Sequence, residues 1–410
     1  MLAVLLIVTL LLMWLVMAAP LGVRTVRTTV PVDLDVGEVW SALYPFGENA
    51  CWHHSATEIA RSDGRTGCIT TEHTGRDGEP IKRTFELVED VPNETFALRY
   101  THDTSLADSF WEHHHQSVSL DAQGDKTSVT FAETDRYRGI AFMVYRFFAM
   151  RRMARQFKQW ASTGTYTRGG WFDRIETQFA MAGVSTLLLW PLFGLHLDGF
   201  FLAAALTMVV ALHELGHVAA FRISGHKTAR MVFLPLLGGF AMGGRPYDSH
   251  FEIAFAALMG AGFSAFVAAG LWFAHVAGLP LGPWRDELLV GVLICAIFNL
   301  GNILPVWKFD GGQILRQVFR RRLHLYAVSI GLLLAIGVYA HGLGVPLGFI
   351  VISIAVVVAL RLLTGTNTIR PRSALVQMRM FERALAFAGL VSVITIHAII
   401  AQWSWQALFS

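Results

Sequence analysis

Charged side chains are scarce in this chain of 410 residues. Only 15% of its residues are Asp, Glu, Lys or Arg, whereas soluble domains average about 25%. Hydrophobic residues make up 54% of the sequence, and the mean hydropathy is +0.47. This composition excludes an ordinary soluble protein. The length leaves room for one soluble domain beside a membrane-embedded region.

Cysteine is also rare. Cys51, Cys68 and Cys295 form no Cys-x-x-Cys pair, so the sequence indicates neither a disulfide framework nor a thiolate zinc site. The net charge is only +3. No basic tract is interleaved with aromatic residues as a nucleic-acid groove would require, so no nucleic-acid partner is expected.

Long apolar segments are abundant instead. Residues 1–19 carry no charge, and they are long enough to cross a bilayer core of about 30 Å. A cleavable signal peptide would have a basic start and an apolar core of about 7–15 residues, so we expect an uncleaved anchor within residues 1–22. Seven further apolar spans follow at 176–195, 200–221, 252–279, 287–305, 324–341, 344–363 and 382–402. The sequence thus predicts a polytopic α-helical membrane protein of about eight spans.

Lysine and arginine are divided unevenly between the two sides of these spans. All but one of the 33 Lys and Arg residues lie in loops on one side, and only Arg285 lies on the other. Short basic loops stay in the cytoplasm, so this division predicts both termini outside and residues 23–165 inside. We therefore expect an integral protein of the cell (inner or plasma) membrane, surrounded by the lipid bilayer.

Residues 23–165 differ from the rest in their frequent charges and turn signals. A strand is predicted at 25–32, a short helix at 36–43 and a long helix at 139–162. Strand-like alternation also marks 68–74, 82–88, 95–101, 113–120 and 128–134. A strand, a helix, several antiparallel strands and a long closing helix form an α+β pattern.

The opening of this domain carries a resemblance. Val30-Pro31-Val32-Asp33, followed by the helix that begins at Val36-Gly37-Glu38-Val39-Trp40, resembles the first strand and helix of the START and polyketide-cyclase-like superfamily, which has the helix-grip fold. The resemblance implies a cavity between the sheet and the long helix that accepts an apolar ligand.

The membrane region contains His213-Glu214-Leu215-Gly216-His217 in an almost wholly apolar stretch. Histidines four residues apart lie on one face of a helix, so both imidazoles can bind one zinc ion. Glu214 is placed to act as a general base toward water. Ionisable side chains in a membrane helix are costly and usually functional. The competing interpretation is a few polar residues packed into a helix bundle.

A third zinc ligand is expected from a later segment. Asp310 lies at the inner end of another predicted span, at a depth comparable to that of His217. Pro305 interrupts the helix before it. Asn302 is an uncharged donor suited to hold a substrate carbonyl or its developing oxyanion.

These two segments together resemble a known family. His-Glu-x-x-His in a membrane helix, followed about ninety residues later by Asn-x-x-Pro-x-x-x-x-Asp-Gly-Gly, is similar to the site-2 proteases, which are intramembrane zinc metalloproteases. The resemblance covers roughly residues 176–323 and leaves 324–410 as C-terminal transmembrane helices. It implies that His213, His217 and Asp310 bind zinc, that Glu214 activates water and that Asn302 assists at the carbonyl.

One loop extends this resemblance. The sequence from Pro235 to Phe240, Pro-Leu-Leu-Gly-Gly-Phe, resembles the Gly-Gly loop of the family. The resemblance implies that Gly238 and Gly239 lie in a short strand structure near the substrate.

The resemblances together predict a zinc metalloendopeptidase that cleaves a transmembrane protein in or near its membrane segment. The cytoplasmic domain would regulate activity or select the substrate. Two alternatives stay open. One is a membrane-bound ligand sensor with a structural or inactive metal site, although a structural site would not need Glu214. The other is a transporter that uses His213 and Asp310 as a proton or metal path, which internal repeats would support; the sequence shows none.

Overall fold

The computed structural model describes residues 11, 14–16, 18–170, 174–234, 238–279, 285–306, 309–363 and 371–409. The chain divides into two compact units. The first comprises the described parts of Met1–Gly170 and Thr364–Ala374, and the second those of Trp171–Leu363 and Leu375–Ser410.

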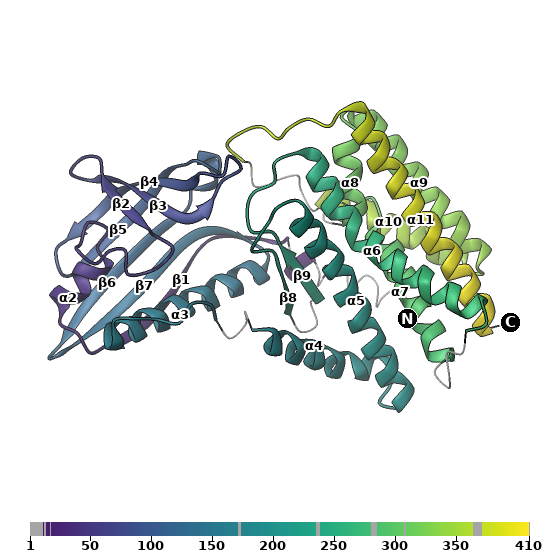
Figure 1. Cartoon of the computed structure of the whole chain (residues 1–410), viewed down its shortest axis with the longest axis horizontal. Coiled ribbons are helices and arrows are strands. Elements are labelled where there is room, and N and C mark those ends of the chain that lie inside the picture. The colour runs from purple at the N-terminus through teal and green to yellow at the C-terminus, as the bar shows by residue number, and fades with distance from the viewer. Residues whose placement is uncertain are drawn as a thin grey trace. The chain divides into compact units, whose positions relative to one another are not determined.

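The first unit is built on a seven-stranded antiparallel sheet in the order β1-β7-β6-β5-β4-β3-β2 (Figure 1). Its strands are β1 (Pro20–Val32), β2 (Glu58–Arg61), β3 (Thr66–Thr74), β4 (Pro80–Val91), β5 (Thr95–Asp103), β6 (His115–Gln123) and β7 (Lys126–Arg138). Strands β2 to β7 pair with their neighbours in sequence, and β1 joins the edge of β7. Helix α2 (Val36–Leu43) and the short 3-10 helix η1 (Asp108–Phe110) connect strands, and α3 (Ile140–Thr163) closes the unit.

Local sequence explains these elements. Residues two apart along the strands, such as Phe96 and Leu98, face the core, and α3 contributes Phe157 to it. The Oδ1 atom of Asp35 accepts a hydrogen bond from Glu38 N at 2.9 Å and so caps α2. Gly164, with φ 70°, ends α3. An antiparallel sheet with a long closing helix against β1 and β7 resembles the helix-grip arrangement predicted from the sequence (Figure 1).

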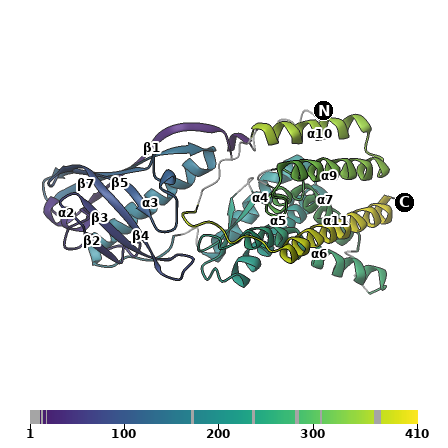
Figure 2. The same cartoon turned by 90° about the horizontal axis from the view of Figure 1, so that it is seen from above.

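The second unit is mainly helical. It contains α4 (Ile175–Leu189), the 3-10 helix η3 (Trp190–Phe193), α5 (Leu197–Ile223), α6 (His250–Val276), α7 (Arg285–Asn302), α8 (Asp310–Val318), α9 (Arg322–Gly342), α10 (Leu347–Leu363) and α11 (Met380–Phe409). Strands β8 (Arg230–Leu234) and β9 (Gly238–Met242) form an antiparallel pair. Helices α6, α7 and α11 pack against one another, and α5 packs on α6 and α7 (Figure 2).

Small residues bring α5 and α6 close together. A Cβ atom on Gly216 would lie 2.1 Å from the carbonyl oxygen of Met259, so only glycine fits at this crossing. Buried Ala256 on α6 continues the contact, since it lies in one cluster with Ala220 and Phe221 of α5. Small residues at such interfaces let helix backbones approach closely, as in membrane helix bundles.

Four of the described helices are long and apolar enough to cross a membrane: α5, α6, α9 and α11. They are compatible with a membrane protein. Helix α4 has 15 residues and α10 has 17, and α7 begins with the charged residues Arg285, Asp286 and Glu287. The described residues therefore contain four candidate spans, and the predicted total of eight is not supported. The predicted anchor lies largely outside the described residues.

The core of the first unit generates a stability prediction. Phe157 on α3 is 0% exposed, whereas Phe148 on the same helix is 46% exposed. Phe157→Ala should lower the free energy of unfolding by about 3–5 kcal/mol because it leaves a cavity. Phe148→Ala, the matched control, should change it by less than about 0.5 kcal/mol. Urea unfolding of the purified chain, followed by tryptophan fluorescence, measures both, and equal destabilisation would contradict this core.

Candidate metal centre

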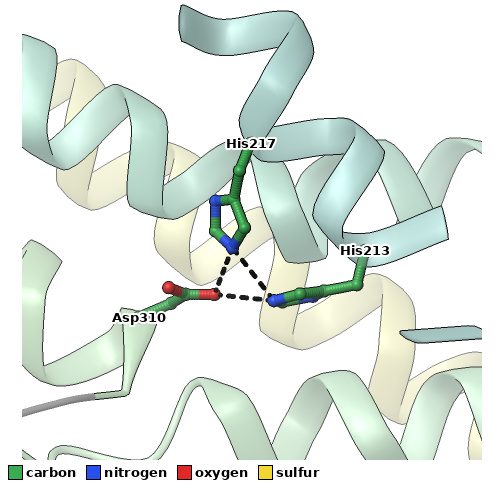
Figure 3. Close-up of side chains that lie close together, drawn as sticks. All are labelled: His213, His217 and Asp310. Carbon is green, nitrogen blue, oxygen red and sulfur yellow. Dashed lines mark hydrogen bonds and ion pairs between the residues drawn. The ribbon is translucent and has the colours of Figure 1, made fainter. Parts of the chain in front are cut away.

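Three side chains with metal-binding groups meet inside the second unit (Figure 3). His213 and His217 project from α5, and Asp310 is the first residue of α8. The Oδ2 atom of Asp310 lies 3.1 Å from His213 Nε2 and 3.4 Å from His217 Nε2. The two Nε2 atoms are 3.1 Å apart. The structure thus brings together the three residues that the sequence predicts as zinc ligands.

Hydrogen bonds to the other ring nitrogens orient both imidazoles. His213 Nδ1 donates to Asn299 Oδ1 at 2.8 Å, and His217 Nδ1 donates to the carbonyl oxygen of Ala256 at 2.7 Å. These oxygens can only accept, so each Nδ1 carries the hydrogen and each Nε2 presents a lone pair. Asn299 is itself oriented by its Nδ2, which donates to the carbonyl oxygen of Cys295 at 2.8 Å.

Three acceptor atoms therefore face one another in a buried space. Only 2% of His213 and 6% of Asp310 is exposed. Apart from the two Nε2 atoms, Asp310 Oδ2 has no hydrogen-bond partner among the described residues, and a buried acceptor that receives no hydrogen is costly. Either a proton on one Nε2 atom or a cation held by all three groups would stabilise this arrangement.

The separations are those of a hydrogen bond, and they also suit a bound cation. Tetrahedral zinc with bonds of about 2.0–2.1 Å places its ligand atoms about 3.3 Å apart. The three observed separations of 3.1, 3.1 and 3.4 Å lie close to this value. Two imidazole nitrogens and one carboxylate oxygen are also donors that zinc prefers. The residues of this centre therefore fit a zinc ion.

Glu214 lies against strand β9. Its Oε2 atom accepts a hydrogen bond from Ala241 N at 2.8 Å. A Cβ atom on Gly239 would lie 2.5 Å from Glu214 Cγ, so glycine makes room for this side chain. Gly238 has φ 90°, in the region that favours glycine. Residues 235–237 of the predicted loop lie outside the described residues.

Helix α6 packs closely against both imidazole rings. A Cβ atom on Gly260 would lie 2.5 Å from His217 Nε2 and 2.8 Å from His213 Cε1. The same helix supplies the Ala256 carbonyl oxygen that orients His217. A glycine at position 260 is therefore a steric requirement of the metal centre.

Two asparagines of α7 make different hydrogen bonds, one within the helix and one to a candidate zinc ligand. Asn302, predicted to hold a carbonyl, donates its Nδ2 hydrogen to Phe298 O at 3.1 Å, within its own helix. Its proposed role stays a prediction. Asn299 is 0% exposed and orients His213, a role that the sequence analysis missed. The available signal was a polar amide inside an apolar span, because buried amides need partners.

The chain matches no family model and no curated protein. It is similar to solved structures over about a third of its length. The Aha1 dimer from Colwellia psychrerythraea shares 14% identity over 36% of this chain and 99% of that chain, with a TM-score of 0.28. SSP2350 from Staphylococcus saprophyticus shares 17% identity over 36% and 98%, with a TM-score of 0.27. CalU16 from Micromonospora echinospora shares 14% over 34% and 77%, with a TM-score of 0.25. Similarities at this level bear on neither the metal centre nor an activity.

The close approach of α6 generates a prediction about metal binding. Gly260→Ala should weaken zinc binding about 10–100-fold, the loss typical when the groups around a metal site are disturbed. Gly270→Ala is the matched control, because a Cβ atom there meets nothing within 4 Å. Both changes raise helix propensity equally. Zinc affinity is measured by competition with a chelator, and undiminished affinity in Gly260→Ala would contradict the described packing.

Proposed function

We propose that this chain is an intramembrane zinc metalloprotease of the site-2 protease type. The observation that carries the proposal is the buried set of acceptor atoms on His213, His217 and Asp310, with separations that fit zinc. The two histidines lie on α5, one of the helices that is long and apolar enough to cross a membrane. Glu214, a potential general base, lies between them in the sequence.

The protein groups have distinct roles in this proposal. His213, His217 and Asp310 would hold zinc, which when bound polarises a peptide carbonyl and favours ionisation of water. Glu214 accepts the proton from the attacking water and passes it to the departing amine. Asn299 and the Ala256 carbonyl keep the imidazoles oriented. Asn302 donates a hydrogen bond to the substrate carbonyl.

In this proposal, the β8–β9 pair holds the substrate beside the metal centre. A carbonyl inside a transmembrane helix is already hydrogen-bonded, so the substrate must unwind before cleavage. Strand β9 pairs with β8 along one edge, and its Ala241 N–H is directed to Glu214. A substrate segment that adds to β9 as a further strand would be bound next to the general base.

The arrangement in the membrane belongs to the same proposal. Residues 1–19 form an anchor, the chain crosses the membrane about eight times, and the helix-grip-like domain lies in the cytoplasm at the cell membrane. All three candidate zinc ligands lie outside that domain. Its role in this proposal is to regulate the protease or select its substrate, and its ligand is an apolar molecule.

The alternative function is a ligand sensor with a structural metal site, which the helix-grip-like domain favours. Structural zinc sites usually have four protein ligands, whereas catalytic sites have three and keep one open position. The described residues supply three ligands in this cluster. This number favours the catalytic function.

One substitution separates these functions. Glu214→Gln should retain about one zinc per chain, because Glu214 is not among the proposed ligands, but it should abolish cleavage. Asp198→Asn is the control, since Asp198 is an exposed carboxylate in the first turn of the same helix. Quantitative proteomics of membranes should show an uncleaved substrate accumulating with Glu214→Gln only.

The metal ligands give the complementary result. His213→Ala combined with His217→Ala should remove both zinc and cleavage. If Glu214→Gln binds zinc normally and leaves the membrane proteome unchanged, the protease assignment is wrong and the sensor function is favoured.

A further inference from the structure

A pocket of about 530 Å³ lies elsewhere in the second unit, and neither the metal centre nor the proposed protease activity uses it. It is formed by the end of α8, the start of α9 and the start of α11, which share a hydrophobic core. None of the three candidate zinc ligands or Glu214 lines it. The pocket is therefore a separate candidate binding site.

The wall of the pocket is apolar. Phe319 and Phe387 pack edge to face, with ring centroids 5.6 Å apart. Met380, at the first position of α11, is 89% exposed beside them. Aromatic and aliphatic side chains of this kind bind hydrocarbon rather than a fully hydrated solute.

The rim of the pocket is cationic. Arg320, Arg321 and Arg383 line it together with His324, and no carboxylate does so among the described residues. The three guanidinium groups form no hydrogen bond or ion pair with any described residue, and Arg383 Nε is buried without a partner. Arg320 and Arg321 are exposed and Arg383 is half-buried. Three guanidinium groups around one pocket suit an anionic ligand, and their planar fork matches phosphate.

The position of the pocket indicates where that anion comes from. Helices α9 and α11 both begin at the pocket, and both are long and apolar enough to cross a membrane. If they do, their first turns lie at the boundary between membrane and water. No side chain caps the N terminus of α9, and the positive end of the helix dipole there favours a negative charge.

We propose that this pocket binds one anionic phospholipid. Its phosphate contacts Arg320, Arg321 and Arg383, and one acyl chain lies against Phe319 and Phe387. A free phosphate ion would use the arginines but not the apolar wall, so the wall favours the lipid. The site does not depend on the metal centre, and its failure would leave the proposed protease function unaffected.

The test is native mass spectrometry of the full-length protein in detergent, titrated with dioleoyl phosphatidylglycerol or dioleoyl phosphatidylcholine. We expect one saturable phosphatidylglycerol per chain, bound about tenfold or more tightly than phosphatidylcholine. Arg320→Gln with Arg321→Gln should remove this preference. Lys227→Gln with Arg230→Gln is the matched control, since it removes two exposed charges that lie outside the pocket but on the same predicted side of the membrane.

A second variant tests the pocket without changing charge. Ala384→Phe should fill the pocket and weaken phosphatidylglycerol binding about tenfold. The proposal is wrong if the double arginine variant keeps the preference, or if Ala384→Phe binds as tightly as the native chain, since binding would then be a diffuse surface attraction. Displacement of the lipid by millimolar inorganic phosphate would instead assign the pocket to a soluble anion.

Discussion

The helical unit depends on one electrostatic constraint. The acceptor atoms of His213, His217 and Asp310 lie within 3.1–3.4 Å of one another in a buried space, and lone pairs at such distances repel unless a positive charge lies among them. Four helices meet this constraint together. Helix α5 supplies the histidines, α8 the aspartate, α7 the Asn299 side chain and α6 a backbone carbonyl.

Glycines are as important to this arrangement as the polar side chains, because they let the helices and strand β9 approach the site closely. A Cβ atom on Gly260 would collide with both imidazoles, and one on Gly239 would collide with Glu214. A Cβ atom on Gly311 would lie 1.7 Å from the carbonyl oxygen of Ile303, so glycine lets the start of α8 pack against that turn and positions Asp310. The glycines near the site therefore set the distances between its polar groups.

Much of the secondary structure and the histidine pair could be predicted, because both depend on patterns among residues that are close in sequence. The bounds of α2 match the predicted 36–43, and α3 begins and ends within one residue of the predicted 139–162, since alternation and helical periodicity reflect neighbours in sequence. The four-residue strand β2 was missed because its side chains are half-buried or exposed and show no clear alternation. The spacing of His213 and His217 likewise depends on one helix.

The parts that could not be predicted depend on packing between helices. Asn299 and Gly260 act on histidines from other helices, and periodicity within one segment carries no information about such contacts. Asn302 was chosen by resemblance, and its described hydrogen bond stays within α7. Hydropathy identified apolar segments but not helix lengths, so four of the predicted eight spans are supported by the described helices.

The central claim is that two imidazoles and one carboxylate hold a zinc ion. X-ray absorption at the zinc edge of the purified chain tests it most directly, because this method distinguishes sulfur ligands from nitrogen ligands. The nearby thiol is that of Cys295, whose Sγ lies 3.5 Å from Nδ2 of Asn299, the residue that orients His213. The account predicts only nitrogen and oxygen neighbours at about 2.0–2.1 Å, including two imidazoles. A sulfur neighbour at about 2.3 Å, or a protein that binds no zinc when zinc is supplied, would contradict it.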